Sequence, residues 1–379
     1  MLYITLLDQF HPGIYKSQVI DVCEHLNKSL NKKITLVAFL SIREIKTAKP
    51  KIKAIYSNSI VLPAFPGLKN FEYTAIFLAL YCLIKRPRTI ICRNAFATTI
   101  ALKVRKWKLI DTVIYDARSA LHAEIKEYDV FPNDYLRNNI FDIENNATLF
   151  SDYRMAVSQQ LVNYWKQHYN YASDKHVVIN CTLNSEYTNF KIDENAIQFK
   201  RAELGFNKDD IILIYSGSTS PWQSFQLMYQ SFKPFLLADK NIKFIFLSKK
   251  TNEIDNLINE FPNQISNYYV SESELLNYLQ IGDYGVMIRQ QSDTNKVAAP
   301  VKFPEYLLAS LNVIVSENLG DYTEFVKTHH CGVVFSENTQ LKKIDFNQKN
   351  KNHKLAKTYF NKNSAIINAK YQRIIKEVL

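Results

Sequence analysis

The strongest constraint on the fold of this chain is the regular alternation of short apolar runs with helix-length segments along its whole length. In the first half the strand-like runs are Leu2–Leu7, Ile34–Leu40, Thr89–Cys92, Thr112–Tyr115, Arg154–Val157 and His176–Asn180. In the second half they are Ile211–Tyr215, Lys243–Leu247, Tyr268–Val270, Gly285–Ile288, Val313–Val315 and Val333–Phe335. Continuous apolar runs joined by helix-length segments are typical of parallel sheets with helices on both faces. The sequence therefore predicts an α/β protein with doubly wound parallel sheets.

The segments between the runs carry apolar residues at helical spacing. Helices are predicted near residues 16–30, 70–85, 94–107, 132–150, 158–168, 222–237, 251–260, 272–280, 301–309, 320–328, 338–348 and 364–379. Segment 51–63 is ambiguous, with a strand at Ser59–Leu62 as one interpretation, and the Lys- and Asn-rich segment 349–363 is predicted to be a loop. With the polar segment Cys181–Glu194 as linker, the expected domains are residues 1–182 and 183–360, followed by a C-terminal helix at 361–379.

The length and composition fit two globular domains. A chain of 379 residues with 47% hydrophobic and 22% charged residues can build two separate cores. Its longest apolar segment, Tyr73–Ile84, is shorter than the roughly 18 residues that a membrane-spanning helix needs, and is predicted to be a packed helix. Five widely spaced cysteines predict reduced core thiols. Because the chain begins as a strand and not as an export signal, these features predict a cytoplasmic protein.

The net charge of +11 is concentrated in the first half of the chain. Residues 1–180 hold 24 Lys and Arg against 15 Asp and Glu, and residues 181–379 hold 23 against 21. Basic clusters at Lys85–Arg88 and Arg105–Lys108 follow apolar helical segments, which suits peripheral contact with the anionic inner face of a membrane. A solvated basic surface is the alternative. Nucleic acid is not an expected partner, because the sequence contains no nucleic-acid-binding motif.

Residues 285–320 carry the clearest chemistry. A buried strand ends at Arg289, a polar loop covers Asn295–Lys302, and a short helix leads into a second buried strand. Ligands of open α/β sheets lie beyond the carboxyl ends of the strands, where Arg289 and this loop are expected. Lys302 and Glu305 are three residues apart, so they share one helix face and can both contact one ligand. An ordinary βαβ unit with surface charges is the alternative.

The segment Ala299-Pro300-Val301-Lys302-Phe303-Pro304-Glu305-Tyr306 resembles the donor motif of glycosyltransferase family 4. The resemblance implies the GT-B fold, in which two Rossmann-like domains face a cleft and a terminal helix crosses back to the first domain. It also implies metal-independent, retaining transfer of a sugar from a nucleotide-sugar, with UDP expected, to a glycan or lipid-linked acceptor in bacterial-type surface polysaccharide synthesis. By the same resemblance Arg289 and Lys302 are catalytic and Glu305 binds the ribose. Many members carry a second Glu where this chain has Val297, so its sugar contacts lack their usual residue.

The segment Ile211–Gln223 is a strand followed by a loop of small residues. Gly217 allows close backbone approach, and amides at the start of a helix favour phosphate. Typical family members have an Arg and a Lys-Gly pair where this chain has Ser218 and Gln223, so bases elsewhere must meet the diphosphate. The predicted donor-binding residues are Gly217, Ser218, Trp222, Gln223, Lys249, Val270, Ser271, Lys296, Ala299, Pro300 and Glu305. A glycine turn without phosphate, and capping by Ser271, are the alternatives.

The most charged strand end of the first half contains Asp116, Arg118, His122 and Glu124. Asp116 is the predicted catalytic residue that orients or deprotonates an acceptor hydroxyl, with His122 as a second candidate base. Arg118 is expected to bind an acceptor anion or Asp116 itself. The predicted acceptor-binding residues are Gly13, Ser17, Arg93, Arg118 and Glu124, the first two from the loop Leu7–Val19. A structural Asp–Arg pair that closes the loop is the alternative.

Several motifs of other enzyme classes are missing from the sequence. It has no Asp-x-Asp pair, spaced Cys/His cluster, Walker loop, Gly-x-Ser-x-Gly elbow or Gly-x-Gly-x-x-Gly segment. We therefore expect no metal and no other cofactor, with Arg and Lys stabilising the leaving group. Two other functions stay open: a nucleotide-sugar epimerase of the same fold, and a non-catalytic nucleotide-sugar-binding protein.

Overall fold

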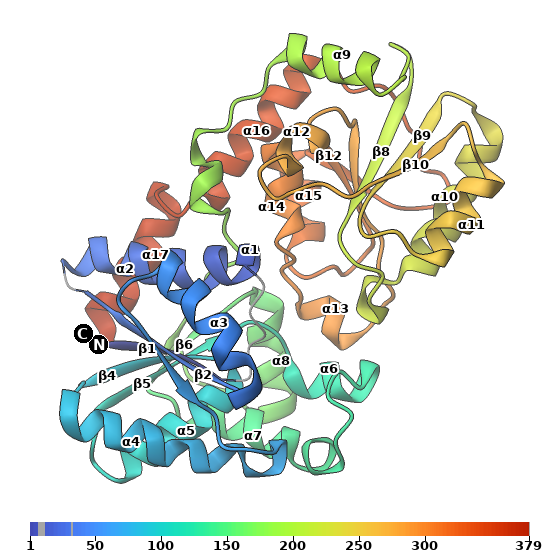
Figure 1. Ribbon diagram of the computed structural model, residues 1–379. Helices are drawn as coiled ribbons and strands as arrows, with labels where there is room; N and C mark the ends of the chain where they lie inside the picture. Colours follow the sequence, from blue (N-terminus) through green and yellow to red (C-terminus); the bar gives the residue numbers. More distant parts are fainter. Residues whose placement is uncertain (7–11, 32, 379) are drawn as a thin grey trace. The chain divides into compact units, whose positions relative to one another are not determined.

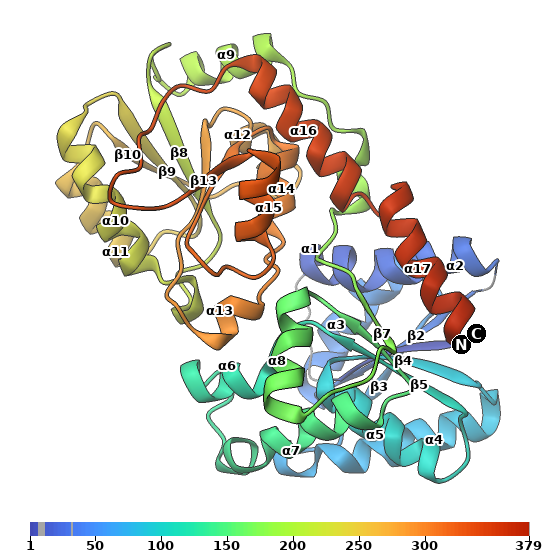
Figure 2. The same cartoon turned by 180° about the vertical axis from the view of Figure 1, so that it is seen from behind.

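The computed structural model describes residues 1–6, 12–31 and 33–378 of the chain (Figure 1). The chain separates into two compact units. The first comprises Met1–Ser185 and Lys362–Leu379, and the second comprises Glu186–Asn361. Each unit contains one parallel sheet with helices on both faces (Figure 1 and Figure 2).

The first unit is built on a seven-stranded sheet with the order β3-β2-β1-β4-β5-β6-β7. Its strands are β1 (Leu2–Leu6), β2 (Thr35–Leu40), β3 (Ser59–Pro63), β4 (Thr89–Arg93), β5 (Thr112–Ala117), β6 (Tyr153–Ala156) and β7 (His176–Val178). β1 pairs in parallel with β2 on one side and with β4 on the other. The strand order therefore reverses at β1 and β4, and ligands of such sheets bind beyond the carboxyl ends of the strands at this reversal.

Helices cover both faces of the first sheet. They are α1 (Pro12–Tyr15), the π-helical turn η1 (Lys16–Ile20), α2 (Asp21–Leu30), α3 (Ile42–Ile55), the 3-10 segment η2 (Leu68–Tyr73), α4 (Thr74–Lys85), α5 (Asn94–Lys106), α6 (Leu121–Tyr128), α7 (Asp134–Phe150), α8 (Gln159–Tyr169) and α17 (Ala365–Val378). Figure 1 shows α2, α3 and α17 on one face and α4, α5 and α7 on the other. Ile367, Tyr371 and Ile374 of α17 are buried in the core of this unit, and α17 lies beside α2 (Figure 2).

The second unit is built on a six-stranded parallel sheet with the order β10-β9-β8-β11-β12-β13. Its strands are β8 (Ile211–Ser216), β9 (Ile242–Leu247), β10 (Ile265–Tyr268), β11 (Tyr284–Met287), β12 (Asn312–Val315) and β13 (Gly332–Val334). β8 pairs with β9 on one side and with β11 on the other, so the strand order reverses at β8 and β11. The segments that follow these two strands contain Gly217 and Arg289.

Helices of the second unit are η3 (Ser185–Asn189), α9 (Glu194–Glu203), η4 (Pro221–Gln223), α10 (Phe225–Ala238), α11 (Asn252–Glu260), α12 (Leu275–Leu279), α13 (Asp293–Val297), α14 (Lys302–Leu308), α15 (Tyr322–His329) and α16 (Phe346–Phe360). Gly285 on β11 sets the position of α14. A β-carbon at residue 285 would lie 2.3 Å from the ring of Tyr306, so the ring can lie against this strand because the residue is glycine.

The predicted fold class, two doubly wound parallel α/β sheets with a C-terminal helix, is confirmed. The structure differs from the prediction in elements whose apolar residues are weakly spaced. Helix α3 is missing from the prediction, because most of its residues are exposed and Pro50 interrupts its sequence. Helices α6, α9 and α13 are also missing from the prediction. Strand β10 ends at Tyr268, so the predicted strand Tyr268–Val270 is wrong by most of its length.

The predicted loop at 349–363 and the predicted helix at 338–348 are both wrong, because the helix there is α16. Polar residues occupy part of its buried face. Lys349 Nζ donates to the carbonyl of Gly282 at 2.5 Å, and Asn352 Nδ2 donates to the carbonyl of Leu311 at 3.0 Å. When the polar side chains of a buried helix face form hydrogen bonds, the sequence lacks the apolar periodicity from which a helix is predicted.

All five cysteines are buried and free. Among residues 1–6, 12–31 and 33–378, no helix combines the length and the apolar character that crossing a bilayer requires.

Candidate functional site

The carboxyl edge of the second sheet brings the loop after β8 against the start of α14. Gly217 has φ +127°, a conformation that side-chain-bearing residues rarely adopt. A β-carbon on Gly217 would lie 3.0 Å from Lys302 Nζ. The glycine therefore leaves the room that the Lys302 side chain occupies. The Gly217 amide donates to the carbonyl of Leu247, so this N–H is not available to a phosphate.

Two cations of this edge share one neutral acceptor. Lys302 Nζ donates to Gln223 Oε1 at 2.9 Å, and Arg289 Nη2 donates to the same oxygen at 2.9 Å. Arg289 Nη1 also donates to Asn295 Oδ1 at 3.3 Å. Within the described chain, Lys302 forms no ion pair. The arrangement places two positive groups around a single amide oxygen, at the reversal of strand order where ligands of such sheets bind.

The electrostatics of Lys302 are unfavourable in the free protein. Burial lowers the pKa of Lys302 well below its usual value, the neighbouring charge of Arg289 lowers it further, and Glu305 opposes the shift. The ring of Tyr215 lies 4.2 Å from Nζ and offsets part of this cost by a cation–π contact. An anion bound beside Lys302 and Arg289 would stabilise both charges.

Glu305 lies in the first turn of α14, three residues after Lys302, which begins the helix. Burial raises its pKa to about 8, with Glu272 adding to the shift and Lys302 opposing it. The side chain is partly exposed, and no donor in the part of the chain that the structure describes hydrogen-bonds to it. Its carboxyl oxygens are therefore open to hydroxyl groups of a ligand.

The neighbouring backbone is fixed by hydrogen bonds. The Tyr306 hydroxyl accepts from the Ser216 amide at 2.9 Å, which ties α14 to the end of β8. The Arg289 amide donates to Ser316 Oγ at 3.2 Å, which ties the end of β11 to the end of β12. Lys302 thus stands on a helix that is tied to β8, and Arg289 follows a strand whose end is tied to that of β12, which favours a preorganised site.

The other predicted donor-binding residues lie around this edge with fewer contacts. Ser218 Oγ bonds Ser220 Oγ at 2.7 Å, and Trp222 is half-buried beside Gln223 in η4. The remaining positions are Lys249 and Lys296, both exposed, Val270 and Pro300, both half-buried, and Ala299, buried. A cavity of about 440 Å³ borders the loop and is lined by Thr219, Ser220, Pro221, Ser224, Phe225, Gln226, Leu227, Glu253 and Gln290.

Ser271 does not cap a helix as proposed from the sequence. Helix α12 begins at Leu275 without a side-chain cap, and Ser271 Oγ donates to Glu274 Oε2 at 3.0 Å. Val297, which stands where many family members carry a second Glu, is 1% exposed. An apolar side chain there is consistent with the packing of α13 and offers no carboxylate to a sugar.

In the first unit, Asp116 is the predicted catalytic residue and is 1% exposed. The hydroxyl of Tyr3 donates to Asp116 Oδ2, and Arg118 Nη1 approaches Asp116 Oδ1 at 3.4 Å. Burial and the Asp116 charge raise the pKa of Tyr3 well above its usual value, so the phenol keeps its proton. These contacts favour the structural Asp–Arg interpretation over a free general base.

Three of the predicted acceptor-binding residues meet at Gln18. Arg118 Nη2 donates to Gln18 Oε1 at 2.6 Å, and Arg93 Nη1 donates to the Gln18 carbonyl at 3.2 Å. Ser17 Oγ accepts from Gln18 Nε2 at 3.3 Å within the π-helical turn η1. Gly13, half-buried in α1, is near in sequence, and residues 7–11 of the predicted loop lie outside the described residues.

His122 and Glu124 stand on α6, whose start is held by a buried carboxylate. Glu144 accepts from the amides of Leu121 at 3.1 Å and His122 at 2.7 Å. His122 Nδ1 also lies 3.2 Å from the hydroxyl of Tyr164. Burial raises the pKa of Glu124 to about 7, against a hydrogen bond from Ser119. The structure thus places both residues on one short helix. The role of His122 as a candidate base and that of Glu124 in acceptor binding stay predictions.

Sequence reasoning did not single out Tyr215, Asn295 or Gln18, which contact the predicted cations. Tyr215 is the penultimate residue of β8 and Asn295 lies on the short helix α13, so their partners depend on tertiary packing. Gln18 follows Ser17 directly, but an uncharged amide carries no sequence signal for a cation partner.

No protein-family model and no curated protein matches the sequence. The structure resembles solved proteins over almost its full length. A glycosyltransferase from Rickettsia africae ESF-5 has 15% identity and a TM-score of 0.69, covering 99% of this chain and 98% of that chain. HepE of Anabaena, solved in complex with UDP, has 12% identity and a TM-score of 0.71, covering 100% and 99%. Sucrose-phosphate synthase from Thermosynechococcus elongatus has 12% identity and a TM-score of 0.70, covering 100% and 98%.

Identities of this size establish a shared fold and not a shared activity. In this chain the shared fold consists of two parallel Rossmann-like sheets, whose strand orders reverse at β1/β4 and at β8/β11. The chain has the GT-B fold.

Proposed function

We propose that the protein is a glycosyltransferase that moves a sugar from a nucleotide-sugar donor to a glycan or lipid-linked acceptor, with UDP as the expected nucleotide. The observation that carries the proposal is the convergence of Lys302 and Arg289 on Gln223 Oε1. Two cations around one neutral oxygen suit a ligand with adjacent negative charges, and a diphosphate is such a ligand. The resemblance of residues 299–306 to a donor motif, and the UDP in the HepE structure, support a nucleotide-sugar.

The donor is expected to bind along the start of α14. Glu305 would accept hydrogen bonds from the ribose hydroxyls, because its carboxyl group has no donor among the described residues. Lys302, one turn earlier, would then reach the diphosphate together with Arg289. A bound diphosphate would also favour the protonated form of Lys302, whose pKa is lowered by burial.

Catalysis would follow from the charge that develops on the leaving group. When the bond between the sugar C1 and the β-phosphate oxygen breaks, negative charge builds up on the nucleoside diphosphate. Lys302 and Arg289 would stabilise this charge more strongly than the charge of the intact donor, which lowers the barrier. Their partial burial strengthens the effect, because electrostatic interactions are less screened away from water.

The resemblance supports transfer with retention of configuration. In that reaction the acceptor hydroxyl oxygen bonds to C1 from the face that the phosphate leaves, and its proton passes to an oxygen of the leaving phosphate. One C–O bond forms and one breaks, so no oxidant is consumed. In this scheme no side chain has to deprotonate the acceptor hydroxyl, which agrees with the buried, paired state of Asp116.

The test is donor turnover in the absence of acceptor. The protein is incubated with UDP-, GDP- and ADP-linked sugars, and both free nucleoside diphosphate and the sugar isomer are measured by chromatography. A transferase releases nucleoside diphosphate slowly from one donor class, and this release should persist in EDTA and fall in Lys302→Ala. Formation of a new nucleotide-sugar isomer without release would show an epimerase instead. Binding without any turnover would show a non-catalytic binding protein.

A further inference from the structure

Helix α4 has an outward face made of large apolar side chains. The exposed residues are Tyr73, which immediately precedes the helix, and Ile76, Leu80, Leu83 and Ile84. Their exposures run from 48% for Ile76 to 76% for Ile84. The opposite face, with Leu78, Ala79 and Cys82, is buried. Unlike most surface helices, α4 is therefore apolar both toward the core and toward solvent.

The outward residues form one continuous stripe. Their spacing of three, four, three and one residues places them on a single side of the helix, from its first turn to its last. Phe65 extends the stripe at its start, because its ring lies 5.2 Å from the ring of Tyr73. Contiguous exposed apolar surface of this kind marks an interaction site. We call Tyr73, Ile76, Leu80, Leu83 and Ile84 the α4 stripe.

Positive charge gathers where the α4 stripe ends. Arg86 caps the helix in the left-handed conformation, with φ +46°, and Pro87 prevents the helix from continuing. Lys85 and Arg86 are exposed, and neither forms an ion pair within the described residues. The end of the neighbouring helix α5 adds the exposed sequence Lys106-Trp107-Lys108. Arg88 Nε, just before β4, donates to Asp111 Oδ2, just before β5, at 2.7 Å, which links the segments that follow the two helices.

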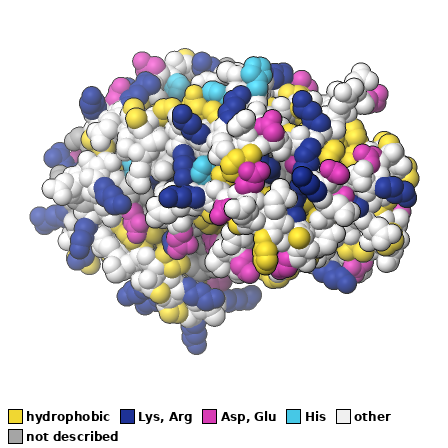
Figure 3. All heavy atoms as spheres, turned by 90° about the horizontal axis from the view of Figure 1, so that it is seen from above, with side chains coloured by type: hydrophobic (Ala, Val, Ile, Leu, Met, Phe, Trp, Pro, Cys, Tyr) yellow, Lys and Arg dark blue, Asp and Glu magenta, His cyan; other side chains and the backbone are white. Residues whose placement is uncertain are grey.

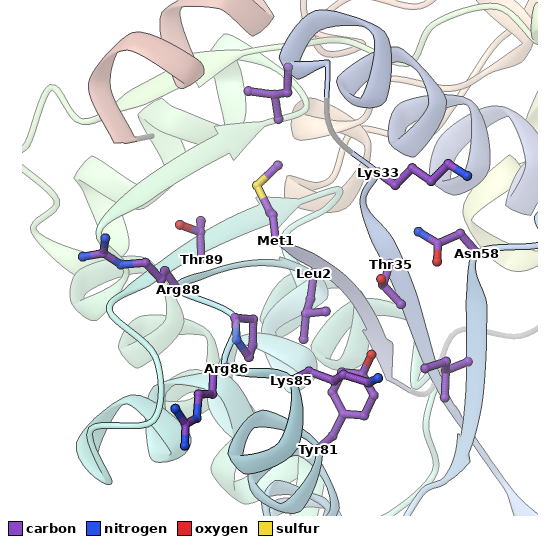
Figure 4. A pocket seen from close by; sticks show the side chains of 13 residues that line it. Met1, Leu2, Lys33, Thr35, Asn58, Tyr81, Lys85, Arg86, Arg88 and Thr89 are labelled. Carbon is purple, nitrogen blue, oxygen red and sulfur yellow. The ribbon is translucent and has the colours of Figure 1, made fainter.

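A basic cavity of about 780 Å³ adjoins this end of the helix (Figure 4). It lies where β1, β2 and β4 begin, at the edge of the sheet opposite to the carboxyl ends. Its charged lining consists of Lys33, Lys85, Arg86 and Arg88, and none of the described residues that line it is a carboxylate. Tyr81 of α4 and Thr35 of β2 add hydroxyl groups. By contrast, basic and acidic side chains are interspersed on the face seen in Figure 3.

We propose that the α4 stripe lies in the headgroup region of an anionic membrane and that the basic cavity takes the phosphate of a lipid headgroup. Interfacial helices bind in this way, with an apolar face in the acyl boundary and Lys or Arg at the headgroups. An aromatic residue beside bases suits the same boundary, and Trp107 stands between Lys106 and Lys108. The inference concerns residues of the first unit, whereas the candidate donor site belongs to the second, so it does not rest on the proposed function.

A bilayer fits this surface better than a second copy of the chain does. A symmetric dimer with parallel α4 stripes would bring the bases Lys85 and Arg86 of both copies together. With antiparallel stripes, the same unpaired bases would be buried against the apolar start of the partner's stripe. Anionic lipid offers the apolar layer and the opposite charge together. Each Lys or Arg near such a surface contributes about 1 kcal/mol, or roughly a fivefold gain in binding.

The experiment is flotation of the full chain with vesicles at physiological salt. Vesicles of phosphatidylcholine alone are compared with vesicles that also contain phosphatidylglycerol. We expect binding to the anionic vesicles and little binding to the neutral ones. Lys85→Ala with Arg86→Ala should weaken binding roughly 30-fold, the product of two charge effects. Ile76→Ser with Leu80→Ser and Ile84→Ser should weaken it by at least about 100-fold.

Matched controls come from α3, on the other face of the sheet. Lys51→Ala with Lys53→Ala removes two exposed bases, and Ile42→Ser removes an exposed apolar residue; both variants should bind as the wild type does. All these positions are exposed, and thermal unfolding checks that each variant is folded.

Four results would overturn the proposal: equal binding to both vesicle types, equal losses in the α3 controls, binding abolished by inorganic phosphate alone, or a dimer in sedimentation that the three-serine variant dissociates. Tighter binding to an oligonucleotide than to anionic vesicles would overturn it as well.

Discussion

The carboxyl edges of the two sheets carry similar charged residues but use them differently. In the first unit, Asp116 is enclosed by Tyr3 and Arg118, and Arg118 in turn donates to Gln18. In the second unit, Lys302 shares a neutral amide oxygen with a second cation, and Glu305 has no hydrogen-bond donor among the residues that the structure describes. The charged carboxylate of the first edge is paired with the protein's own groups, whereas Lys302 and Glu305 of the second edge form no ion pair within the described residues.

This difference separates stability from function. A buried charge that is paired and hydrogen-bonded is costly to disrupt, because removal of one partner leaves the other uncompensated. A buried charge whose pKa is shifted against ionisation, as for Lys302 and Glu305, is unfavourable in the free protein and marks a candidate functional site. We therefore expect substitutions at the first edge to change stability and substitutions at the second edge to change activity.

The largest effect is expected from Asp116→Ala. The variant leaves the Arg118 guanidinium and the Tyr3 hydroxyl without their buried partner, which should lower the free energy of unfolding by about 3–5 kcal/mol in urea titrations. Asp111→Ala, which breaks the exposed pair with Arg88, serves as control and should cost about 0–1 kcal/mol. A variant at residue 116 that is as stable as the wild type but inactive would instead support the catalytic role of Asp116.

The second effect concerns Arg289→Ala and Lys302→Ala. Each removes a group expected to stabilise the leaving diphosphate, so initial rates of sugar transfer should fall roughly 10²–10³-fold. Removal of Lys302 should not lower stability, because its charge is buried beside Arg289. Lys250→Ala is the control, since this exposed lysine pairs with Asp255 at 3.1 Å. Near-normal rates in both variants would remove the two cations from the mechanism.

A smaller effect is expected on binding from Glu305→Ala. Hydrogen bonds to a charged group contribute about 1.5–3 kcal/mol, so the Kd for UDP in calorimetric titrations should rise about 10- to 100-fold. Glu324→Ala changes an exposed carboxylate of α15 and should leave the Kd unchanged. Identical titration curves for Glu305→Ala and the wild type would exclude the ribose role.

The last prediction concerns a pH dependence of stability. Burial raises the pKa of Glu305 in the folded protein from 4.5 to about 8, so the unfolded chain ionises first as pH rises. The stability of the wild type relative to Glu305→Gln should therefore be greatest below about pH 4.5 and decrease until about pH 8. Urea titrations of both proteins across this range measure the difference. Parallel curves would show that the Glu305 environment is not as described.

The sequence predicts the fold well because buried parallel strands are written in continuous apolar runs, as at Ile211–Tyr215 and Thr112–Tyr115. The sequence does not predict an element correctly where the buried face of that element is polar. Helix α16 packs through Lys349 and Asn352, whose hydrogen bonds to backbone carbonyls cannot be foreseen without the neighbouring loops. The sequence also fails to predict helix α3, for a different reason. The face of this helix toward the core is narrow, so few apolar positions mark it.

The candidate site was predictable as far as strand ends determine it. Arg289 follows β11 and Gly217 follows β8, and adjacent parallel strands bring both to one edge. The partners of these residues were not predictable, because Gln223 and Tyr215 contact Lys302 through the particular path of the loop. The same limit applies to Asp116: the sequence lists an Asp and an Arg two residues apart, but only packing adds the Tyr3 hydroxyl from β1.

The most direct test of the ligand-dependent edge is a crystal structure of the protein with UDP. We expect diphosphate oxygens within hydrogen-bond distance of Lys302 Nζ and the Arg289 guanidinium, and ribose hydroxyls on the Glu305 carboxyl group. UDP bound elsewhere, with Lys302 and Arg289 still donating to Gln223 Oε1, would contradict the account.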